Sequence, residues 1–515
     1  KLKVASELSE LCSLVEKGAN AQALAMIDDL LAFKASEKCE VDDECFARLV
    51  KWADDNKIAV GKFPREKESL KNLKELDLSS CNLKSLPDEF TNLQSLEKLN
   101  LGASFAFRLN KFQEFPKALC ELKKLKELDL SKCGLKSLPN EFANLQSLEK
   151  LELWGNEFKE FPKALCELKN LKELNLGCDL NSLPDEFANL QSLEKLDLYE
   201  NKFQEFPKAL CELKNLKELY LSECGLNSLP DEFANLQSLE KLKLKNNEFQ
   251  EFPKALCGLK NLKELDLSSC DLKSLPDEFA NLQSLERLDL GLLKFLSSFP
   301  NRFQEFPKAL CGLKNLKTLN LMFCGLNSLP DEFANLQNLE RLDLWGNKFQ
   351  EFPKVINTLK NLKELGLYEC GLNSLPDKFA NLQNLEKLRL DNNEFQEFPK
   401  ALCELKNLKE LVLYECGLNS LPDKFANLQN LEKLRLDNNE FQEFPKALCE
   451  LKNLKELVLY ECGLNSLPDE FINLQSLERL ELRGNGFYEF PKVINKLKNL
   501  KECDIKEADF QAKEN

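Results

Sequence analysis

One short unit recurs along most of this chain, and a recurrence of this kind decides what the chain can fold into. Two versions of the unit, each of about 23 residues, alternate in nine copies each from residue 70 to residue 496. The first version is LKKLKELDLSKCGLKSLPNEFAN at 122–144, and the second is LQSLEKLELWGNEFKEFPKALCE at 145–167. A unit this short cannot bury its leucines alone, so neighbouring units must stack into one continuous core. The sequence therefore predicts one solenoid over 70–496, in place of several globular domains.

Most units contain the spacing L-x-x-L-x-L-x-x-N/C followed, after one further residue, by Leu or Phe, and in this the chain resembles the leucine-rich-repeat family. It is most similar to the intracellular and bacterial members whose units carry a Leu-Pro or Phe-Pro step. The resemblance implies an α/β fold, namely a leucine-rich-repeat solenoid curved as a horseshoe or a superhelix, with a concave parallel β-sheet and short helical convex segments. It also implies a role in protein association, which most members of the family mediate.

The Leu-x-Leu step of each unit has the alternation expected of a short strand. Leu128 and Leu130 would point into the core, while Glu127 and Asp129 would point to solvent. The proline that follows, such as Pro139, suits the first position of a one-turn helix, where its missing N–H costs nothing. Strands would therefore form the concave side of the solenoid and short helices its convex side.

Both ends of the chain depart from the repeat. Residues 1–69 have helical spacing and then a degenerate half unit, because Phe63-Pro64 aligns with the Phe-Pro step of the second version. We expect this segment to be a helical N-terminal cap that shields the first unit from water, with a separate binding function as the alternative. Residues 497–515 are expected to form a C-terminal half repeat and a tail. The helices predicted for the cap lie near 4–16, 20–33 and 42–55.

The position after the strand is Cys in the first version of the unit and mostly Asn in the second. An inward Asn side chain can satisfy backbone groups that the turn leaves unpaired, and a thiol fits the same position. Sixteen of the twenty cysteines fall at two recurrent positions and are expected to be core thiols. Five residues separate Cys39 from Cys45, which is not a zinc-ligand spacing. The expected ladder asparagines are Asn156, Asn201, Asn247, Asn347, Asn393, Asn439 and Asn485.

The composition argues against catalysis and against several kinds of ligand. The chain has no histidine, so Ser-His-Asp, Cys-His and histidine-metal sites are excluded. No phosphate-binding glycine loop follows a strand. A formal charge of -15 disfavours nucleic acid, and no stretch has the roughly 18 apolar residues of a membrane span. We therefore expect a protein that is not an enzyme and has no metal or cofactor, with a basic or mixed-charge protein as partner.

The cellular location is not fixed by the sequence. The absence of Asn-x-Ser/Thr sequons and the reduced-looking cysteines favour the cytoplasm. The first residue is Lys rather than Met, so a secreted bacterial protein with a removed signal peptide stays open as the alternative.

The outward positions of the concave sheet divide into constant and variable ones. The pair before each strand is almost always Lys-Glu or Glu-Lys, so neighbouring strands should pair opposite charges. The positions within and after the strand vary and collect Tyr, Trp, Met and Arg, the residues enriched at interfaces. Such residues can also merely cover neighbouring strands. The candidate contact residues are Trp154, Tyr199, Tyr220, Met322, Phe323, Trp345, Tyr368, Arg389, Tyr414, Arg435 and Tyr460.

Within this set, Tyr368, Tyr414 and Tyr460 recur every 46 residues. They should stand on alternate strands, about 10 Å apart. Arg389 and Arg435 occupy the intervening strands, and Asp391 and Asp437 follow them two residues on, so charge is expected to interleave the tyrosines.

Two units are longer than the rest directly after the strand. Residues 102–109, GASFAFRL, add six residues, and 291–300, GLLKFLSSFP, add eight. Exposed apolar loops usually mark a contact surface, although these loops could also fold back onto the edge of the solenoid. The candidate contact residues of the insertions are Phe105, Phe107, Leu292, Phe295, Leu296 and Phe299.

The function favoured by the sequence is a protein–protein interaction module that binds its partner on the concave face. Recognition of a glycan or surface polymer, in adhesion or host interaction, is one alternative, because stacked tyrosines also suit sugars. Structural self-association is another, and a homo-oligomer could form through the insertions or the thin C-terminal cap.

Overall fold

The computed structural model describes residues 43–103, 109–249, 251–292, 301–303, 305–349, 351–441, 443–507 and 510. The chain forms two compact units, unit 1 (Lys1–Leu148) and unit 2 (Glu149–Asn515). Both units alternate a short strand with a five-residue 3₁₀ helix. The first two predicted cap helices, near 4–16 and 20–33, lie outside the described residues.

In its described residues, unit 1 contains two α-helices and the first three strands. Its strands are parallel and in register, with Leu99 of the second strand opposite Leu76 of the first and Leu128 of the third. The elements are α3 (Asp43–Asp55), α4 (Lys67–Lys71), β1 (Glu75–Asp77), η1 (Asp88–Asn92), β2 (Lys98–Asn100), η2 (Lys117–Glu121), β3 (Glu127–Asp129) and η3 (Asn140–Asn144).

Unit 2 contains the remaining strands, each paired in parallel with the next along the chain. These strands are β4 (Lys150–Glu152), β5 (Glu173–Asn175), β6 (Lys195–Asp197), β7 (Glu218–Tyr220), β8 (Lys241–Lys243), β9 (Glu264–Asp266), β10 (Arg287–Asp289), β11 (Thr318–Asn320), β12 (Arg341–Asp343), β13 (Glu364–Gly366), β14 (Lys387–Arg389), β15 (Glu410–Val412), β16 (Lys433–Arg435), β17 (Glu456–Val458), β18 (Arg479–Glu481) and β19 (Glu502–Cys503).

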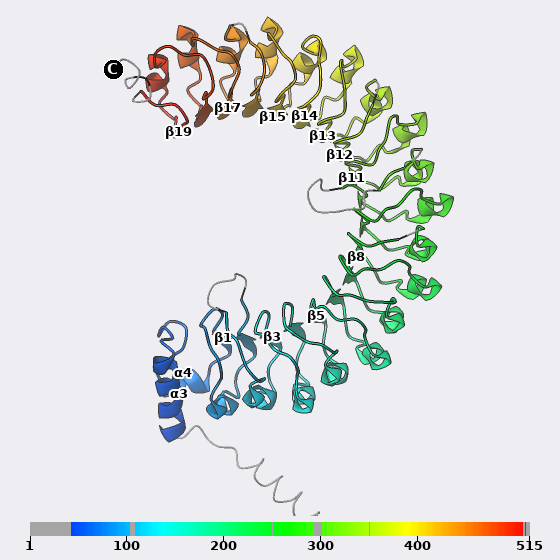
Figure 1. Cartoon of the computed structure of the whole chain (residues 1–515), viewed down its shortest axis with the longest axis vertical. Helices are drawn as coiled ribbons and strands as arrows, with labels where there is room; N and C mark the ends of the chain where they lie inside the picture. The colour runs from blue at the N-terminus through cyan, green and yellow to red at the C-terminus, as the bar shows by residue number, and fades with distance from the viewer. Residues whose placement is uncertain are drawn as a thin grey trace, which may run out of the picture. The chain divides into compact units, whose positions relative to one another are not determined.

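The 3₁₀ helices of unit 2 lie on the opposite side of each repeat from the strands. In Figure 1 the strands line the inner side of this unit's curve and the 3₁₀ helices its outer side. These helices are η4 (Lys163–Glu167), η5 (Asp185–Asn189), η6 (Lys208–Glu212), η7 (Asp231–Asn235), η8 (Lys254–Gly258), η9 (Asp277–Asn281), η10 (Lys308–Gly312), η11 (Asp331–Asn335), η12 (Lys354–Thr358), η13 (Asp377–Asn381), η14 (Lys400–Glu404), η15 (Asp423–Asn427), η16 (Lys446–Glu450), η17 (Asp469–Asn473) and η18 (Lys492–Lys496).

The Leu-x-Leu alternation explains the core of each repeat. Leu365 on β13 stands opposite Leu388 on β14, which stands opposite Leu411 on β15, and all three are buried. Burying one leucine side chain stabilises the fold by roughly 2 kcal/mol, and the same position recurs in each unit. The predicted leucine-rich-repeat solenoid with a parallel sheet is confirmed.

Each 3₁₀ helix follows a proline, but the proline precedes the helix rather than opening it. Pro139 has an extended backbone (φ -73°, ψ 160°), and its carbonyl accepts the Phe142 N–H at 3.1 Å. The prediction of Pro139 as the first helical residue was therefore wrong by one position. Pro139 is instead the N-cap residue: the ring fixes its φ, and its carbonyl accepts the hydrogen bond that closes the first turn.

Phenylalanine pairs join the convex sides of neighbouring repeats. In unit 2, Phe352 before η12 meets Phe379 of η13 edge to face, with ring centroids 5.3 Å apart. The same contact joins Phe398 to Phe425 at 5.6 Å. Such pairs contribute about 0.5–1.5 kcal/mol beyond the area they bury. They explain why the first version of the unit always carries Phe in its helix.

The predicted Asn and Cys ladder is present and carries backbone hydrogen bonds. Asn393 donates to the carbonyls of Leu367 (2.8 Å) and Leu390 (2.7 Å), and it accepts the Leu372 N–H at 2.9 Å. The Cys370 thiol donates to the Leu344 carbonyl at 3.3 Å. Both side chains therefore bond backbone groups inside the core.

Two ladder asparagines escaped the sequence prediction because the insertions displace them. Asn110 donates to the carbonyls of Leu78 (2.9 Å) and Leu101 (2.7 Å) in unit 1. Asn301 donates to the carbonyls of Leu267 and Leu290 in unit 2, both at 2.8 Å. Each insertion thus lies between the strand and an intact ladder position.

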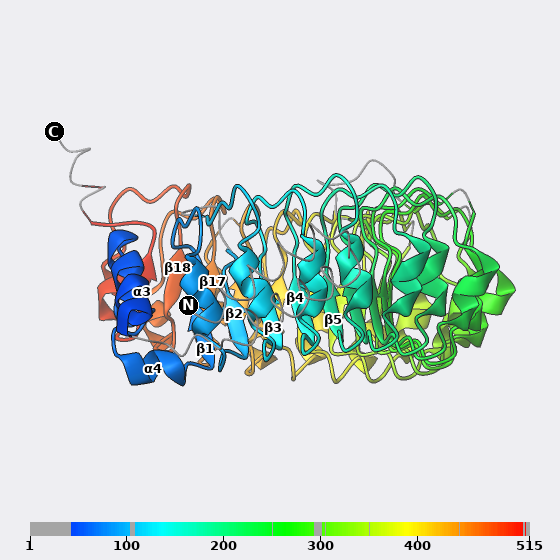
Figure 2. The ribbon, with the colours of Figure 1, turned by 90° about the horizontal axis from the view of Figure 1, so that it is seen from below.

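The third predicted cap helix, near 42–55, is α3. Its Trp52 ring meets Phe90 edge to face at 5.2 Å and Phe63 at 5.7 Å, while Leu49 and Ala53 are fully buried. Figures 1 and 2 place α3 and α4 at the β1 end of unit 1. Helix α3 therefore packs against the first repeat, and its role as a cap that shields this repeat from water stays a prediction.

Candidate functional site

Three aromatic rings from neighbouring repeats touch one another on the concave face of unit 2. Phe323 follows β11, Trp345 follows β12, and Tyr368 follows β13. The Phe323 and Trp345 ring centroids are 5.0 Å apart, and those of Trp345 and Tyr368 are 4.8 Å apart. The Arg389 guanidinium, from β14, lies over the Tyr368 ring at 5.6 Å. We call these four residues the aromatic row.

Two positions without side chains leave room for this packing. A Cβ atom on Gly346, whose φ is +70°, would lie 2.2 Å from the Phe323 ring. A Cβ atom on Gly366 would lie 2.8 Å from an Asp343 carboxylate oxygen. Burial raises the pKa of Asp343, and the backbone N–H of Trp345 and the charge of Arg389 act in the opposite direction. The row is thus packed from below by glycine backbone and a partly buried carboxylate.

Polar contacts fix the ring orientations while part of each ring stays exposed. The Trp345 indole N–H points to the Glu369 carboxylate at 3.5 Å. The Asn392 amide donates to the Tyr368 hydroxyl at 3.1 Å. Phe323, Trp345 and Tyr368 are each only partly buried. A partner would therefore meet rings that are already ordered, which lowers the entropy cost of binding. The sequence prediction included none of these glycines and polar supports.

Arg389 and Arg435 place charge between the tyrosines, as expected, but Asp391 and Asp437 do not. Asp391 and Asp437 are 3% and 4% exposed, so neither is an outward charge. Each accepts from the arginine two residues earlier on its own repeat, at 2.9 and 3.0 Å. Burial raises the pKa of Asp391, and Arg389 opposes this.

The tyrosines at 414 and 460 continue the surface beyond the row. Tyr368, Tyr414 and Tyr460 follow β13, β15 and β17, which are separated by β14 and β16, so the tyrosines belong to alternate strands, as predicted. The Asn438 amide donates to the Tyr414 hydroxyl at 3.3 Å, and the Tyr460 hydroxyl donates to Glu461 at 2.6 Å. The pKa of Tyr460 is raised by its hydrogen bond to Glu461. The pKa of Tyr414 is raised by a hydrogen bond to Glu415, and the bond to Asn438 acts in the opposite direction.

Met322 was expected on the contact surface, but it is 7% exposed. The Leu292 N–H donates to the Met322 carbonyl at 2.9 Å, so the chain leaving β10 lies against it. Leu292 is itself partly buried. The other insertion candidates, namely Phe105, Phe107, Phe295, Leu296 and Phe299, lie outside the described residues.

The remaining concave candidates belong to a different surface, on β4–β8. Trp154 is partly buried, and Tyr199 is 40% exposed. Tyr220 is surrounded by the ammonium groups of Lys195, Lys241 and Lys243, at 5.4–5.9 Å from its ring. The Tyr220 hydroxyl donates to Glu218 at 2.6 Å. The Lys-x-Lys-x-Lys pattern that begins in β8 could have predicted lysines around Tyr220, but the sequence prediction did not use it.

The predicted charge pairing before each strand is confirmed. Lys363 meets Glu340 at 2.8 Å, and Lys409 meets Glu386 at 2.7 Å, each joining adjacent strands. These side chains are 40–52% exposed, so each pair contributes little, about 0–1 kcal/mol. The opposite charges of these pairs neutralise each other along this part of the concave face.

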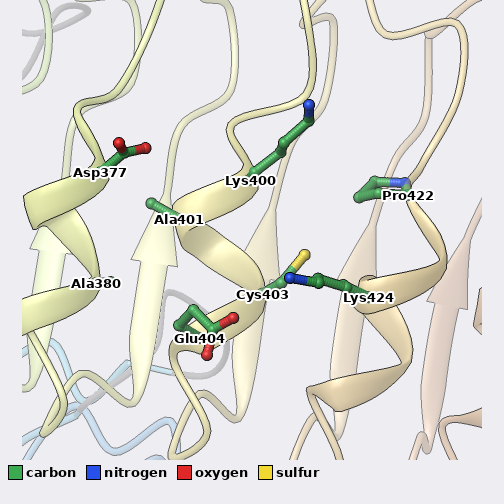
Figure 3. Close-up of a pocket in the computed structure, with 8 residues that line it drawn as sticks. All are labelled: Asp377, Ala380, Lys400, Ala401, Cys403, Glu404, Pro422 and Lys424. Atoms are coloured by element: carbon green, nitrogen blue, oxygen red, sulfur yellow. The ribbon is translucent and has the colours of Figure 1, made fainter.

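A pocket of about 480 Å³ lies on the convex side, between η13, η14 and η15. Figure 3 shows Lys424 of η15 pointing toward Cys403 of η14, with Glu404 and Lys400 at the rim. In the described part of the chain, no three Asp, Glu or Cys side chains gather closely enough to hold a metal ion. None of the helices described has the length and apolar character that a membrane crossing requires.

Comparisons with known proteins give the same repeat. The family described as Leucine-rich repeat region matches residues 108–223, 208–325, 304–414 and 354–461, more than half of the chain, and the Leucine Rich Repeat family matches 72–93. The structure of a leucine-rich-repeat protein of Leptospira interrogans is 38% identical with a TM-score of 0.68, over 76% of this chain and 98% of that one.

More distant matches include receptors and a plant resistance protein. The crystal structure of a TDR receptor is 27% identical with a TM-score of 0.53, over 84% of this chain and 72% of that one. TMV resistance protein N of Nicotiana glutinosa is 38% identical over 89 residues, which are 16% of this chain and 7% of that protein. The match therefore spans only a small part of the Nicotiana protein.

Proposed function

The chain belongs to the leucine-rich-repeat family, and on that premise we propose that the concave face of unit 2 is a non-enzymatic surface that binds a protein partner. Members of this family are generally binding modules. The partner is expected to be basic or of mixed charge, because the chain carries a formal charge of -15.

The observation that carries the proposal is the aromatic row. Phe323, Trp345 and Tyr368 come from three successive repeats, touch through their rings and end under Arg389. Trp, Tyr and Arg dominate interface hot spots, because they bury a large area with few rotatable bonds. A purely structural role would not need a contiguous, partly exposed run on the solvent side of the sheet.

The row is also pre-organised for binding. The hydrogen bonds from Trp345 to Glu369 and from Asn392 to Tyr368 hold the rings before any partner arrives. A partner then loses less affinity to ordering of the receptor side chains, at about 0.5–1.5 kcal/mol for each side chain that would otherwise be immobilised.

Capture of binding partners from a native lysate, with matched variants, tests the proposal. The immobilised full chain is compared with Trp345→Ser/Tyr368→Ser and with Tyr488→Ser, in which a side chain that is 93% exposed is changed away from the row. Quantitative mass spectrometry should find proteins that are retained by the original chain and by Tyr488→Ser, and are lost from the double variant. Equal capture by all three chains would contradict the assignment. Loss of glycans alone would favour the polymer-binding alternative instead.

A further inference from the structure

We propose that the concave surface of β4–β6 binds an arginine side chain of a protein partner, with the guanidinium between the rings of Trp154 and Tyr199. We call Trp154, Asn175, Asp197 and Tyr199 the Trp-Tyr site. The site lies apart from the aromatic row, around β5 on the inner side of unit 2 (Figure 1). The inference rests on the proposed function only in naming a protein as the source of the arginine.

The Trp-Tyr site is built around the one repeat unit that is shorter than the rest. Residues 168–189 lack one residue directly after the strand, where Gly177 alone precedes the ladder residue Cys178. A Cβ atom on Gly177 would lie 2.6 Å from the Tyr199 carbonyl oxygen, so a side chain there would displace backbone. The turn after β5 therefore contributes no side chain between Trp154, which follows β4, and Tyr199, which follows β6.

The two aromatic residues stand at a spacing that suits a planar cation. Only β5 separates β4 from β6, so the backbones that carry Trp154 and Tyr199 lie about 10 Å apart. A guanidinium midway between them would lie within about 6 Å of both rings, the range of cation–π attraction. Tyr199 is 40% exposed, and burial together with hydrogen bonds to Glu200 and Glu223 raises the pKa of its hydroxyl. A ligand would therefore meet an exposed ring that hydrogen bonds already hold in place.

Asn175, on the strand between the two aromatic residues, has an amide oxygen without a partner. At the same repeat position, Asp197 accepts the Tyr199 N–H and Asp266 accepts the Ser268 N–H, both at 3.0 Å. After the shorter turn this bond is missing, and Oδ1 of Asn175 is buried with no hydrogen-bond partner among the described residues. A buried acceptor without a donor is unfavourable. A half-turn of the amide would exchange its oxygen and nitrogen and present the oxygen to a donor on the concave surface.

The charge of the site favours a cationic donor. Asp197 is partly buried, and no cation lies within 4.0 Å of its carboxylate among the described residues. Burial raises the pKa of Asp197, while its backbone hydrogen bond and the charges of Lys195 and Lys243 act in the opposite direction. Both lysines have other contacts, because Lys195 pairs with Glu218 at 3.6 Å and Lys243 lies over the Tyr220 ring at 5.4 Å. Asp197 can therefore accept a cation from a partner.

An arginine side chain suits both the rings and the two acceptors. Its guanidinium is planar, stacks on aromatic rings and carries several N–H donors in one plane. It can therefore lie between the two rings while it donates to Asp197 and Asn175. A neutral aromatic ring would leave both acceptors unsatisfied, and the ammonium of a lysine is not planar and cannot stack. Glu152, at the same repeat position of β4, already pairs with Lys150 at 3.5 Å, so we expect Asp197 to be the carboxylate that binds.

Titration of small arginine derivatives, followed by the fluorescence of Trp154, tests the inference. Trp52→Phe/Trp345→Phe leaves Trp154 as the one tryptophan of the full chain. Acetyl-arginine amide should change its emission saturably and bind at least about tenfold more tightly than acetyl-citrulline amide, which has a similar shape without the charge. It should also bind more tightly than acetyl-lysine amide and acetyl-phenylalanine amide. Saturation-transfer NMR with the unaltered chain should give the same order of affinities.

Three variants locate the binding. Asp197→Asn keeps an acceptor for the Tyr199 N–H but removes the charge, so it should weaken acetyl-arginine amide at least about tenfold. Asn175→Asp adds a charge to the site and should strengthen binding at least about threefold. The matched control is Asp266→Asn on β9, which should leave the affinity unchanged, because no aromatic residue follows β8, β9 or β10 at the outward position. Unchanged thermal unfolding checks that all three variants are folded.

Each result decides one proposal. Equal or tighter binding of the citrulline, lysine or phenylalanine derivative, or no effect of Asp197→Asn, would overturn the inference. Tighter binding of free arginine than of acetyl-arginine amide would overturn the assignment to a side chain of a protein. If acetyl-arginine amide does not bind while lysate capture still depends on Trp345 and Tyr368, this inference fails and the proposed function stands. If it binds as expected while capture is independent of those two residues, the site stands and the proposed function fails.

Discussion

Two neighbouring stretches of unit 2, 359–404 and 405–450, have the same sequence except that Gly366 of the first is Val412 in the second. Their concave surfaces nevertheless differ. In the first, Arg389 lies over the Tyr368 ring at 5.6 Å, and that ring touches Trp345. In the second, Arg435 makes no such contact with Tyr414 among the described residues, and Val412, which stands in place of Gly366, is buried.

The difference shows how a repeat array acquires a specific site from near-identical parts. Arg389 has Gly366 on the strand before it, whereas Arg435 has Val412. The missing side chain leaves room above β13 for the Asp343 carboxylate, whose oxygen would lie 2.8 Å from a Cβ atom on Gly366. Gly366 or Val412 is therefore the one difference within the two stretches, and Trp345 in the repeat before the first stretch is a second difference in their surroundings.

The prediction with the largest expected effect tests whether the core is the same beneath the two stretches. Asn393→Ala and Asn439→Ala each remove an amide that donates to two buried carbonyls and accepts two N–H groups, at equal distances in the two stretches. Each should lower the free energy of unfolding by about 3 kcal/mol, measured by urea denaturation. A clearly smaller loss for one of them would show that the two repeats do not share one core.

Binding should separate the two stretches. Replacing Tyr368, Tyr414 and Tyr460 by Ser together should weaken partner binding at least about tenfold with little change in thermal stability, because the rings are partly exposed. Tyr368→Ser alone should cost more affinity than Tyr414→Ser, since only Tyr368 joins Trp345 and Arg389. Calorimetric titration with the captured partner measures both. An equal or greater loss for Tyr414→Ser would show that Tyr414 and Tyr460, rather than the aromatic row, contribute most of the binding energy.

The sequence predicted the repeated part of this architecture well, for a physical reason. A position that recurs in every unit, such as the leucines of Leu-x-Leu, or in every second unit, such as the ladder Asn, has the same neighbours each time, so one repeat explains all. Asn110 and Asn301 were missed because an insertion moves them away from the strand by six and eight residues.

The candidate site was predictable only as a set of outward positions. Which rings touch depends on space that a pattern does not encode, such as the glycines at 346 and 366. Met322 and Asp391 share the sequence position of Trp345 and Tyr368, yet both are buried; the chain after β10 lies against Met322, and Asp391 pairs with Arg389. Whether a side chain at this repeat position is buried or exposed therefore depends on local packing and not on the position itself.

Exchanging the one differing residue sharpens the comparison further. Gly366→Val makes the two stretches identical and should displace Asp343 and Arg389, so that Arg389 leaves the Tyr368 ring. With Trp52→Phe and Trp154→Phe leaving Trp345 as the one tryptophan, its fluorescence should report the change. Val412→Gly should leave this fluorescence unaltered and lower stability by about 1–2 kcal/mol, through lost burial and backbone freedom. If Gly366→Val left the Trp345 emission unchanged, the neighbouring Trp345 rather than Gly366 would define the row.

The smallest expected difference lies on the convex side, where the two stretches are followed by unlike residues. Burial raises the pKa of Cys403 to about 11 and that of Cys449 to about 12. Lys424 lowers the first, whereas Glu470 further raises the second. Both thiols should be almost entirely protonated at neutral pH, and most cysteines should titrate as free thiols after denaturation without reductant.

Because the thiolate is the reactive form, alkylation of the folded protein should accelerate as the pH rises, and Cys403 should react faster than Cys449 by up to about tenfold. Mass spectrometry of peptides labelled by iodoacetamide between pH 8 and 10 measures the ratio. The two cysteines are 0% and 1% exposed, so both need the same local opening, and opening cannot by itself separate them. Lys424→Glu gives Cys403 the acidic neighbour of Cys449 and should bring the two rates together. If Cys403 kept its lead in that variant, access through the pocket between η13, η14 and η15, rather than charge, would distinguish the two thiols.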